Sequence, residues 1–221
     1  MSQVRHQVAR TSSRLVSIGP KQLEGFLTVP EHATGLIIFA HGSGSSRLSP
    51  RNAFVAEALQ LRGMATLLFD LLTDEEALDR RNVFDVPLLA SRLEEAVAWA
   101  RADAEVGALK AGLFGASTGS AAALVAAAEI PERVAVIVSR GGRPDLAGAA
   151  LHKVSAPTLL IVGGDDTVVL DLNRDALSNL NCEKSLLVVP GATHLFEEPG
   201  ALDQVARAAS DWFALHLRPK Q

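Results

Sequence analysis

The chain lacks several features that particular classes of protein require. It contains a single cysteine, Cys182, and no tyrosine among its 221 residues. One cysteine excludes an intrachain disulfide and fits a reducing compartment. Without tyrosine, the chain cannot build the Tyr–Lys active site of a short-chain dehydrogenase.

Excess basic charge and long apolar runs are also missing. The formal net charge is −4, from 21 Lys and Arg against 25 Asp and Glu. Binders of nucleic acid or anionic membranes need a basic surface, so neither partner is expected. The apolar stretch 121–128 is too short to span a bilayer, and residues 1–20 are too polar for a secretory signal. We therefore expect a cytoplasmic protein that acts on a small molecule; the sequence leaves its oligomeric state open.

The chain alternates short apolar runs with longer amphipathic segments. The expected strands are 15–18, 25–29, 36–40, 65–69, 111–114, 134–138, 158–162 and 185–189, and the expected helices are 51–62, 86–102, 117–130 and 201–217. Continuous apolar strands that alternate with helices predict an α/β fold, with a mostly parallel sheet covered by helices on both faces. We expect the first two strands to form a short antiparallel pair.

The whole chain, residues 1–221, is expected to form one domain, with residues 1–13 as a flexible N-terminal segment. Only residues 139–156 separate two of the predicted strands, which leaves no room for a substantial helical cap. We therefore expect an open, shallow site. Ligands of such sheets bind beyond the carboxyl ends of the strands, so the functional residues are expected there.

A glycine-flanked serine follows one of these strands. The segment Gly115–Gly119 reads GASTG, which matches G-x-S-x-G between a strand and a helix. The flanking glycines let the backbone pass closely, and the turn raises the serine hydroxyl above the sheet edge. We predict Ser117 to be a nucleophile. The alternatives are a helix-capping serine and a dinucleotide-binding turn, although the latter would need a G-x-G core.

Two carboxylates stand directly after the strand 158–162. Asp165 and Asp166 follow it within the sequence GGDD, so both fall at the ligand-binding edge of the sheet. We predict Asp166 to be the acid that orients a histidine, with Asp165 and Asp145 as competing candidates. The simpler interpretation is an acidic turn that caps the helix after it.

One histidine lies between the last strand and the last helix. His194 stands in the loop GATHLF, and a neutral imidazole at this place can accept the proton of Ser117. The order Ser117, Asp166, His194 is the order found in the α/β-hydrolase fold. We therefore predict His194 to be the base.

The loop after the strand 36–40 is rich in glycine and serine. It reads HGSGSSR from His41 to Arg47, and acyl transfer needs backbone N–H groups aimed at a developing oxyanion. We predict an oxyanion hole formed by the N–H groups of Ser43 and Thr118, with His41 bracing the loop. A phosphate cradle is the alternative, but the P-loop pattern G-x-x-x-x-G-K-[ST] does not follow.

Four arginines fall in loops near the same edge of the sheet, namely Arg47, Arg51, Arg140 and Arg143. Guanidinium groups pair well with carboxylate and phosphate, so an anionic substrate bound by Arg47, Arg140 and Arg143 is one hypothesis. The alternative is that these arginines are solvated or tie loops together. No spacing typical of a metal site is present, and the chemistry needs no cofactor, so neither is expected.

The motifs resemble those of the α/β-hydrolase superfamily, and within it the small, lidless dienelactone-hydrolase-like branch. The resemblance rests on HGSGSSR at 41–47, GASTG at 115–119, VGGDD at 162–166 and GATHLF at 191–196, and it runs from about residue 25 to the last helix. It implies the same triad of Ser117, Asp166 and His194.

The elbow departs from that branch in one respect. Dienelactone hydrolases proper use cysteine as the nucleophile, whereas this chain has Ser117, and Cys182 lies outside any elbow. A thiolate is the stronger nucleophile at neutral pH, which weakens the case for turnover of dienelactones themselves. The expected function is hydrolysis of an ester or related acyl bond through an acyl-enzyme. The alternatives are acyl transfer to another acceptor and a small-molecule receptor on the same fold.

Overall fold

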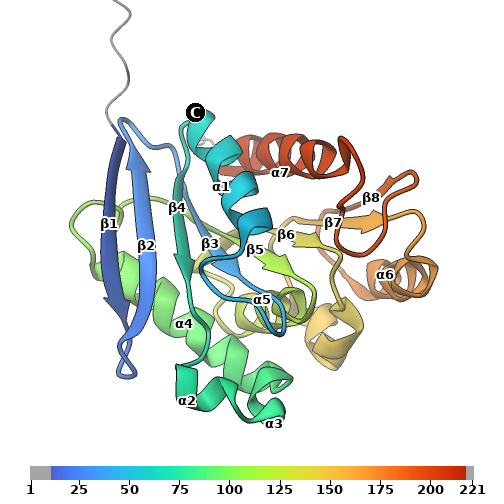
Figure 1. Ribbon diagram of the computed structural model, residues 1–221, viewed down its shortest axis with the longest axis horizontal. Coiled ribbons are helices and arrows are strands. Elements are labelled where there is room, and N and C mark those ends of the chain that lie inside the picture. The colour runs from blue at the N-terminus through green and yellow to red at the C-terminus, as the bar shows by residue number, and fades with distance from the viewer. Residues whose placement is uncertain (1–10, 218–221) are drawn as a thin grey trace, which may run out of the picture.

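The computed structural model describes residues 11–217 and is built on an eight-stranded sheet in the order β1-β2-β4-β3-β5-β6-β7-β8 (Figure 1). The strands are β1 (Thr11–Ile18), β2 (Leu23–Pro30), β3 (Leu36–Ala40), β4 (Ala65–Phe69), β5 (Ala111–Ala116), β6 (Val134–Arg140), β7 (Thr158–Gly163) and β8 (Lys184–Val189). From β4 to β8 all neighbouring strands are parallel, while β2 pairs antiparallel with both β1 and β4. The predicted α/β fold with a mostly parallel sheet is confirmed.

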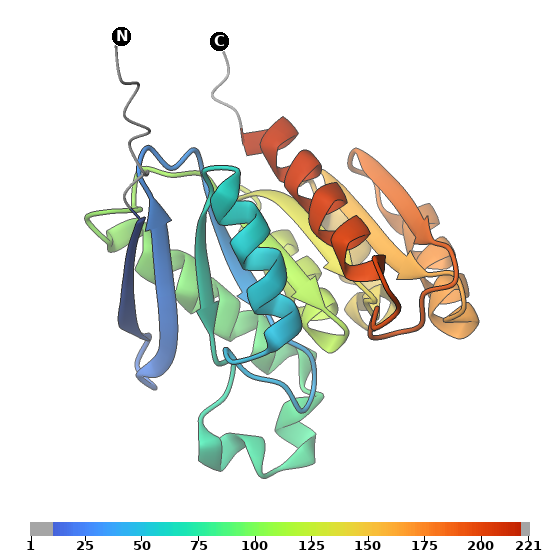
Figure 2. The same cartoon turned by 45° about the horizontal axis from the view of Figure 1, so that its top comes forward.

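Helices cover both faces of the sheet, as predicted. Two helices, α1 (Pro50–Leu61) and α7 (Ala201–Leu217), pack on one face, as Figures 1 and 2 show. The other face carries α4 (Val86–Ala102), α5 (Thr118–Glu129), α6 (Thr167–Asn179) and the 3-10 helix η1 (Pro144–Lys153). The central strands β3, β4 and β5 are therefore buried along their whole length, because both of their faces are covered.

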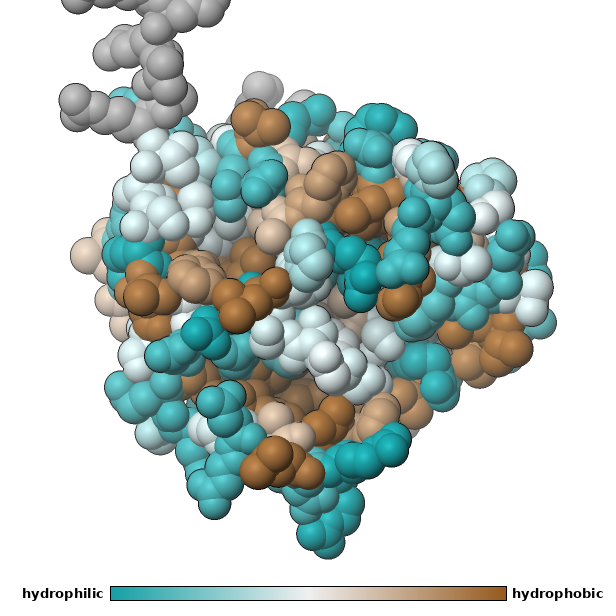
Figure 3. Space-filling view, viewed as in Figure 1, coloured by the Kyte–Doolittle hydropathy of each residue, from teal (hydrophilic) through white to brown (hydrophobic). Residues whose placement is uncertain are grey.

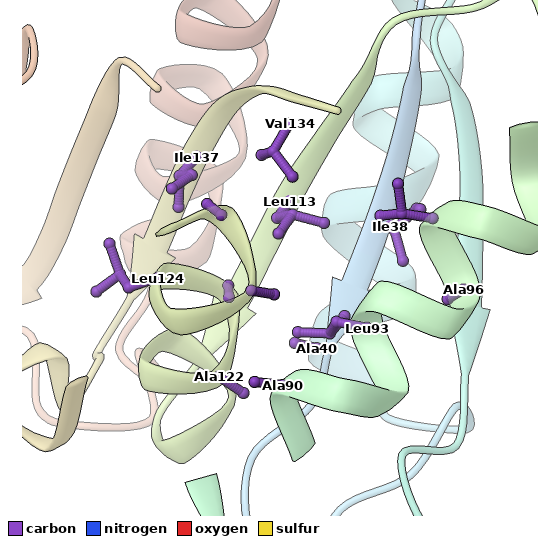
Figure 4. Packing of buried hydrophobic residues seen from close by; sticks show 14 of the residues in the cluster. Ile38, Ala40, Ala90, Leu93, Ala96, Leu113, Ala122, Leu124, Val134 and Ile137 are labelled. Carbon is purple, nitrogen blue, oxygen red and sulfur yellow. The ribbon is translucent and has the colours of Figure 1, made fainter. Parts of the chain in front are cut away.

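Small side chains let α5 lie close to the sheet, beside α4. Figure 4 shows Ala122 of α5 next to Ala90 of α4, with Leu93 of α4 beside Ala40 of β3. At the start of α5, a methyl group on Gly119 would overlap the carbonyl oxygen of Ala40. The glycine of the motif therefore permits a backbone approach that any larger residue would block, and this approach sets the distance between α5 and β3.

Two expectations need correction. The segment 1–13 was expected to be flexible, but Thr11–Ser13 belong to β1 and pair with Pro30, Val29 and Thr28; residues 1–10 lie outside the described part. The polar residues of this edge strand are mostly exposed and hide the alternation that marks a strand. The second concerns the interval between the strand β4 and the helix α4, where no element was predicted.

That interval holds two short helices, α2 (Asp74–Ala77) and α3 (Arg80–Val83). Together they form a lobe that projects from the body of the fold, which Figure 2 shows at its lower edge. A signal for α2 was present, since Thr73 and Glu76 stand at capping-box spacing, and in the structure each side chain bonds the other's backbone N–H, at 3.2 and 3.1 Å. The lobe is anchored to α4 because Glu76 also forms an ion pair, at 3.0 Å, with the buried Arg92 of that helix.

Candidate active site

Ser117 stands at the turn between β5 and α5. Its backbone has φ 51° and ψ −121°, in the region that favours glycine, and such conformations cost about 1–3 kcal/mol. The turn is held by two backbone hydrogen bonds, from the Ser117 N–H to the Arg140 carbonyl at 3.2 Å and from the Arg143 N–H to the Ser117 carbonyl at 3.1 Å. Ser117 occupies the N-cap position of α5, yet its side chain makes no capping bond. The alternative of a helix-capping serine is therefore not supported.

Asp166 and His194 form a hydrogen-bonded pair. The His194 Nδ1 lies 2.7 Å from the Asp166 Oδ2, and the Asp166 side chain is only 15% exposed. The two competing carboxylates are placed elsewhere, since Asp165 is exposed and Asp145 pairs with Arg143 at 2.8 Å. Of the three candidates, Asp166 is the one that the fold brings to the histidine.

The imidazole lies beside the elbow. A methyl group built on Gly141 would stand 3.7 Å from the His194 Cε1, and Gly141 directly follows Arg140, whose carbonyl accepts the Ser117 N–H. The side chain of His194 is 38% exposed, so it is open to a ligand that reaches this edge. The loops after β5, β7 and β8 thus bring Ser117, Asp166 and His194 to one edge of the sheet.

The glycine-serine loop after β3 lies against the elbow. A methyl group on Gly42 would stand 3.0 Å from the Ser117 Cβ, and the Ser43 N–H donates to the Thr118 hydroxyl at 3.0 Å. The two residues predicted to form the oxyanion hole therefore meet beside Ser117. An oxyanion is a stronger acceptor than a neutral hydroxyl, so an arriving ligand can take over the Ser43 N–H.

His41 ties this loop to the segment after β4. Its Nε2 accepts the Leu71 N–H at 3.1 Å, so the proton sits on Nδ1, which donates to the Gly42 carbonyl at 3.0 Å. Burial lowers the pKa of His41 below its ordinary 6.5, while the Gly42 hydrogen bond and the charge of Asp70 act in the opposite direction. His41 is thus a neutral brace whose Nε2 must stay unprotonated.

This brace predicts a pH-dependent contribution to stability. Because the folded pKa is lowered, the unfolded chain takes up a proton that the folded chain does not, so the contribution is complete above pH 6.5 and is lost as the pH falls below it. The slope is at most about 1.4 kcal/mol per pH unit. Urea unfolding of the protein and of His41→Gln at several pH values checks this. The difference in the free energy of unfolding should shrink on acidification, and a pH-independent difference would contradict the prediction.

Two of the three arginines predicted to bind substrate are engaged by carboxylates of this chain. Arg47 is ion-paired with Asp70 and Glu24, and Arg143 forms a two-pronged pair with Asp145, at 2.9 and 2.8 Å. The Asp145 carboxylate holds the pKa of Arg143 above its ordinary value. Their charges are therefore compensated within the fold.

Arg140 is different. It is buried at the end of β6, where its Nη2 donates a long 3.4 Å hydrogen bond to the Asn52 side chain, and no carboxylate of residues 11–217 forms an ion pair with it. Burial, and then the charge of Arg51, lowers the pKa of Arg140 to about 10. Arg51 itself reaches outward to Glu197, at 3.2 Å. Arg140 is thus the one predicted substrate-binding arginine whose charge is not compensated by an ion pair in the described chain.

A cavity of about 240 Å³ lies next to the glycine-serine loop after β3, between that loop and the α2–α3 lobe. Figure 3 shows this face hollowed above the lobe, with apolar side chains in the hollow. The short segment 139–156 predicts an open, shallow site, and η1, which follows β6, places no cap over it. The cavity arises instead from the lobe between β4 and α4, for which no element was predicted.

The described residues form neither a metal-binding cluster nor a membrane-spanning helix. Within residues 11–217, no group of three or more His, Cys, Asp or Glu side chains is placed to hold a metal ion. None of the helices in the described part of the chain is both long and apolar enough to cross a membrane.

The fold and the loops at its edge define a class of protein, the hydrolases of the α/β-hydrolase fold. The model of the dienelactone hydrolase family matches residues 24–217, and the chain belongs to this family. A crystal structure of dienelactone hydrolase from Anabaena variabilis is 56% identical, with a TM-score of 0.91 over 96% of this chain and 100% of that one. Est1E from Butyrivibrio proteoclasticus has the same fold, at 17% identity and a TM-score of 0.77 over 93% of this chain and 98% of that one.

Two curated relatives are larger proteins. In two strains of Mycobacterium tuberculosis, a protein named "Putative phosphoribosyl transferase" is 59% identical over 202 residues, which are 91% of this chain but 46% of that protein. The chain therefore spans about half the length of these relatives.

Proposed function

We propose that the chain is a serine hydrolase that cleaves an ester or related acyl bond of a small molecule through an acyl-enzyme intermediate. The observation that carries this proposal is the 2.7 Å bond between Asp166 and His194 at the edge where Ser117 stands in a strained turn. Strained backbone at the tip of such a turn is a feature of functional sites.

In the proposed reaction, the Nε2 of His194 takes the proton of the Ser117 hydroxyl as the oxygen attacks the substrate carbonyl. Asp166 holds the other ring nitrogen, which fixes the tautomer and stabilises the imidazolium. The carbonyl oxygen becomes an oxyanion and accepts the N–H groups of Ser43 and Thr118. The leaving oxygen then takes the proton from His194 as its bond to the carbonyl carbon breaks. Water next gives a proton to His194 as it attacks the acyl-enzyme, and the Ser117 oxygen regains that proton as the acid is released.

The name of the mycobacterial relatives does not alter this proposal. The name belongs to proteins of which this chain spans about half, whereas the model of the hydrolase family matches residues 24–217, most of this chain. The residues at the ligand-binding edge also suit acyl chemistry, with a nucleophile, a base and paired N–H donors.

An anionic group on the leaving part of the substrate is a further part of the proposal, and Arg140, at the end of β6, is its candidate partner because Arg47 and Arg143 are already paired. Arg140→Gln is expected to lower kcat/KM for an anionic ester about tenfold more than for a neutral ester, since charge-assisted hydrogen bonds contribute about 1.5–3 kcal/mol. Arg143→Gln, the matched control, should affect both esters equally. Equal effects of Arg140→Gln on the two esters would remove this part of the proposal.

Covalent labelling tests the central proposal. The folded protein is treated with a fluorophosphonate at neutral pH, and the modified residue is identified by mass spectrometry. Labelling is expected at Ser117 and not at Ser45, an exposed serine of the neighbouring loop. Urea-unfolded protein is the control, because activation needs the assembled triad. Absence of labelling in folded protein would overturn the proposal and favour a small-molecule receptor.

A further inference from the structure

The cavity beside the glycine-serine loop touches the site at one defined place. Its lining includes Ser43 and Thr118, the two residues that would hold the oxyanion, but neither Ser117 nor His194. A substrate carbonyl bound by these two N–H groups would therefore have one of its two substituents at the mouth of the cavity. This substituent is either the acyl chain or the leaving group of the ester.

Sheet topology indicates which of the two lies at the cavity. The cavity is lined by segments that follow β3 and β4, which lie on one side of β5, whereas His194 follows β8 on the other side. The leaving oxygen must be near His194, because it takes the proton from that imidazole. The leaving group therefore points toward β6–β8, and the acyl group points away from His194, into the cavity.

The lining indicates the chemistry of the acyl group. The segments after β4 contribute the apolar side chains of Leu71, Leu72, Ala77, Val83 and Leu89, which Leu48 joins, and the loop 41–46 with Thr118 forms an uncharged polar wall. The charged members are Asp70, Asp74 and Arg47, and Arg47 is already paired with Asp70 and with Glu24. A carboxylate on the acyl group would be repelled by Asp74, and Arg47 is the one cation among these lining residues, so an uncharged group is favoured.

The volume limits the size. Apolar cavities of about 150 Å³ hold benzene, so the 240 Å³ here admits a phenyl-sized group with a few further carbons. We propose that this cavity binds the acyl moiety of the ester and selects uncharged, apolar acyl groups up to about this size. The proposal rests on the proposed hydrolase function and adds the substrate class, with the α2–α3 lobe as the element that determines specificity.

Ala77→Phe tests the proposal, because it adds a ring inside the cavity from the wall formed by α2. Nitrophenyl esters with one common leaving group are compared, from acetate through butyrate and hexanoate to phenylacetate. In the unmodified protein, kcat/KM should rise along this series. In Ala77→Phe, kcat/KM for hexanoate and phenylacetate should fall at least about tenfold, with acetate within about twofold, as expected for an occluded apolar pocket.

Leu78→Phe is the matched control, since Leu78 stands on the same lobe but is 86% exposed and does not line the cavity. It should leave the whole acyl series within about twofold. Val83→Phe, which fills the cavity from α3, serves as the second variant if Ala77→Phe does not fold. A nitrophenyl hemisuccinate, with a charged acyl group, should react at least about tenfold more slowly than the butyrate, because its carboxylate would lose hydration against the apolar side chains of the cavity.

Acetates of progressively larger alcohols separate the two possible orientations. If Ala77→Phe impairs these acetates and spares the long acyl esters, the cavity holds the leaving group and the proposal is overturned. The same holds if kcat/KM of the unmodified protein does not depend on acyl size. These outcomes differ from failure of the hydrolase function itself, in which Ser117 would not react with a fluorophosphonate at all.

Discussion

Replacing Ser117 with alanine is expected to lower kcat for ester cleavage by about a millionfold, as loss of the nucleophile does in other serine hydrolases. The residual rate, about a thousandfold above that in water, would come from the oxyanion hole and from substrate binding. Steady-state assays on a nitrophenyl ester measure the loss, and far-ultraviolet circular dichroism confirms the fold. A variant that keeps more than about one per cent of the activity would contradict the role of Ser117.

A second substitution at this position separates chemistry from strain. Ser117→Gly removes the same hydroxyl but can adopt φ 51° without a steric cost, whereas Ser117→Ala cannot. The free energy of unfolding of the glycine variant should exceed that of the alanine variant by about 1–2 kcal/mol, within the usual cost of such strain. Urea unfolding of both inactive variants measures this. Equal stabilities would mean that the turn is not strained in solution.

Asp166→Asn is expected to lower kcat by about four orders of magnitude, the loss known for the corresponding change in another serine hydrolase. The asparagine keeps the size of the side chain, but its amide can donate to His194 Nδ1 and so favour the wrong tautomer. The His194 Nε2 would then carry a proton and could not accept that of Ser117. Stopped-flow or steady-state ester hydrolysis at neutral pH measures the effect.

Asp165→Asn is the matched control, one residue away in the same turn. Asp165 is exposed, and its described hydrogen bond is made by its backbone N–H to the Ala192 carbonyl at 3.0 Å, which the substitution keeps. Activity should stay within about fivefold, because an exposed charge contributes less than about 1 kcal/mol. If the two asparagine variants lost activity equally, the acid would not be assigned to Asp166 alone.

The parallel sheet and most of its elements followed from local patterns. Apolar runs such as 36–40 and 65–69 are continuous because strands buried on both faces have no polar side, and this pattern is visible without any tertiary contact. The positions of Ser117, Asp166 and His194 followed from the same logic, since each stands just after a strand of that sheet. The carboxyl ends of parallel strands share one edge, so succession along the chain predicts proximity in space.

The states of the charged groups could not be predicted in this way. Arg47, Arg140 and Arg143 look alike in sequence, yet two are ion-paired and one is buried without a carboxylate partner. Asp70 and Glu24, which neutralise Arg47, are each 23 residues away from it, and no local pattern connects them. The edge strand β1 was partly missed for a related reason, because its pairing depends on backbone hydrogen bonds rather than on its exposed polar side chains.

The sequence by itself determined the succession of strands and most of the long helices along the chain, the glycines of the elbow and the identity of the residues at the ends of the strands, because these depend on neighbours along the chain. Only the tertiary structure decided that Asp166 rather than Asp165 reaches His194, that Ser43 meets Thr118 and that the α2–α3 lobe encloses a cavity. The reason is physical: hydrogen bonds, ion pairs and enclosed volume depend on distances between segments that are far apart in sequence, and packing sets those distances.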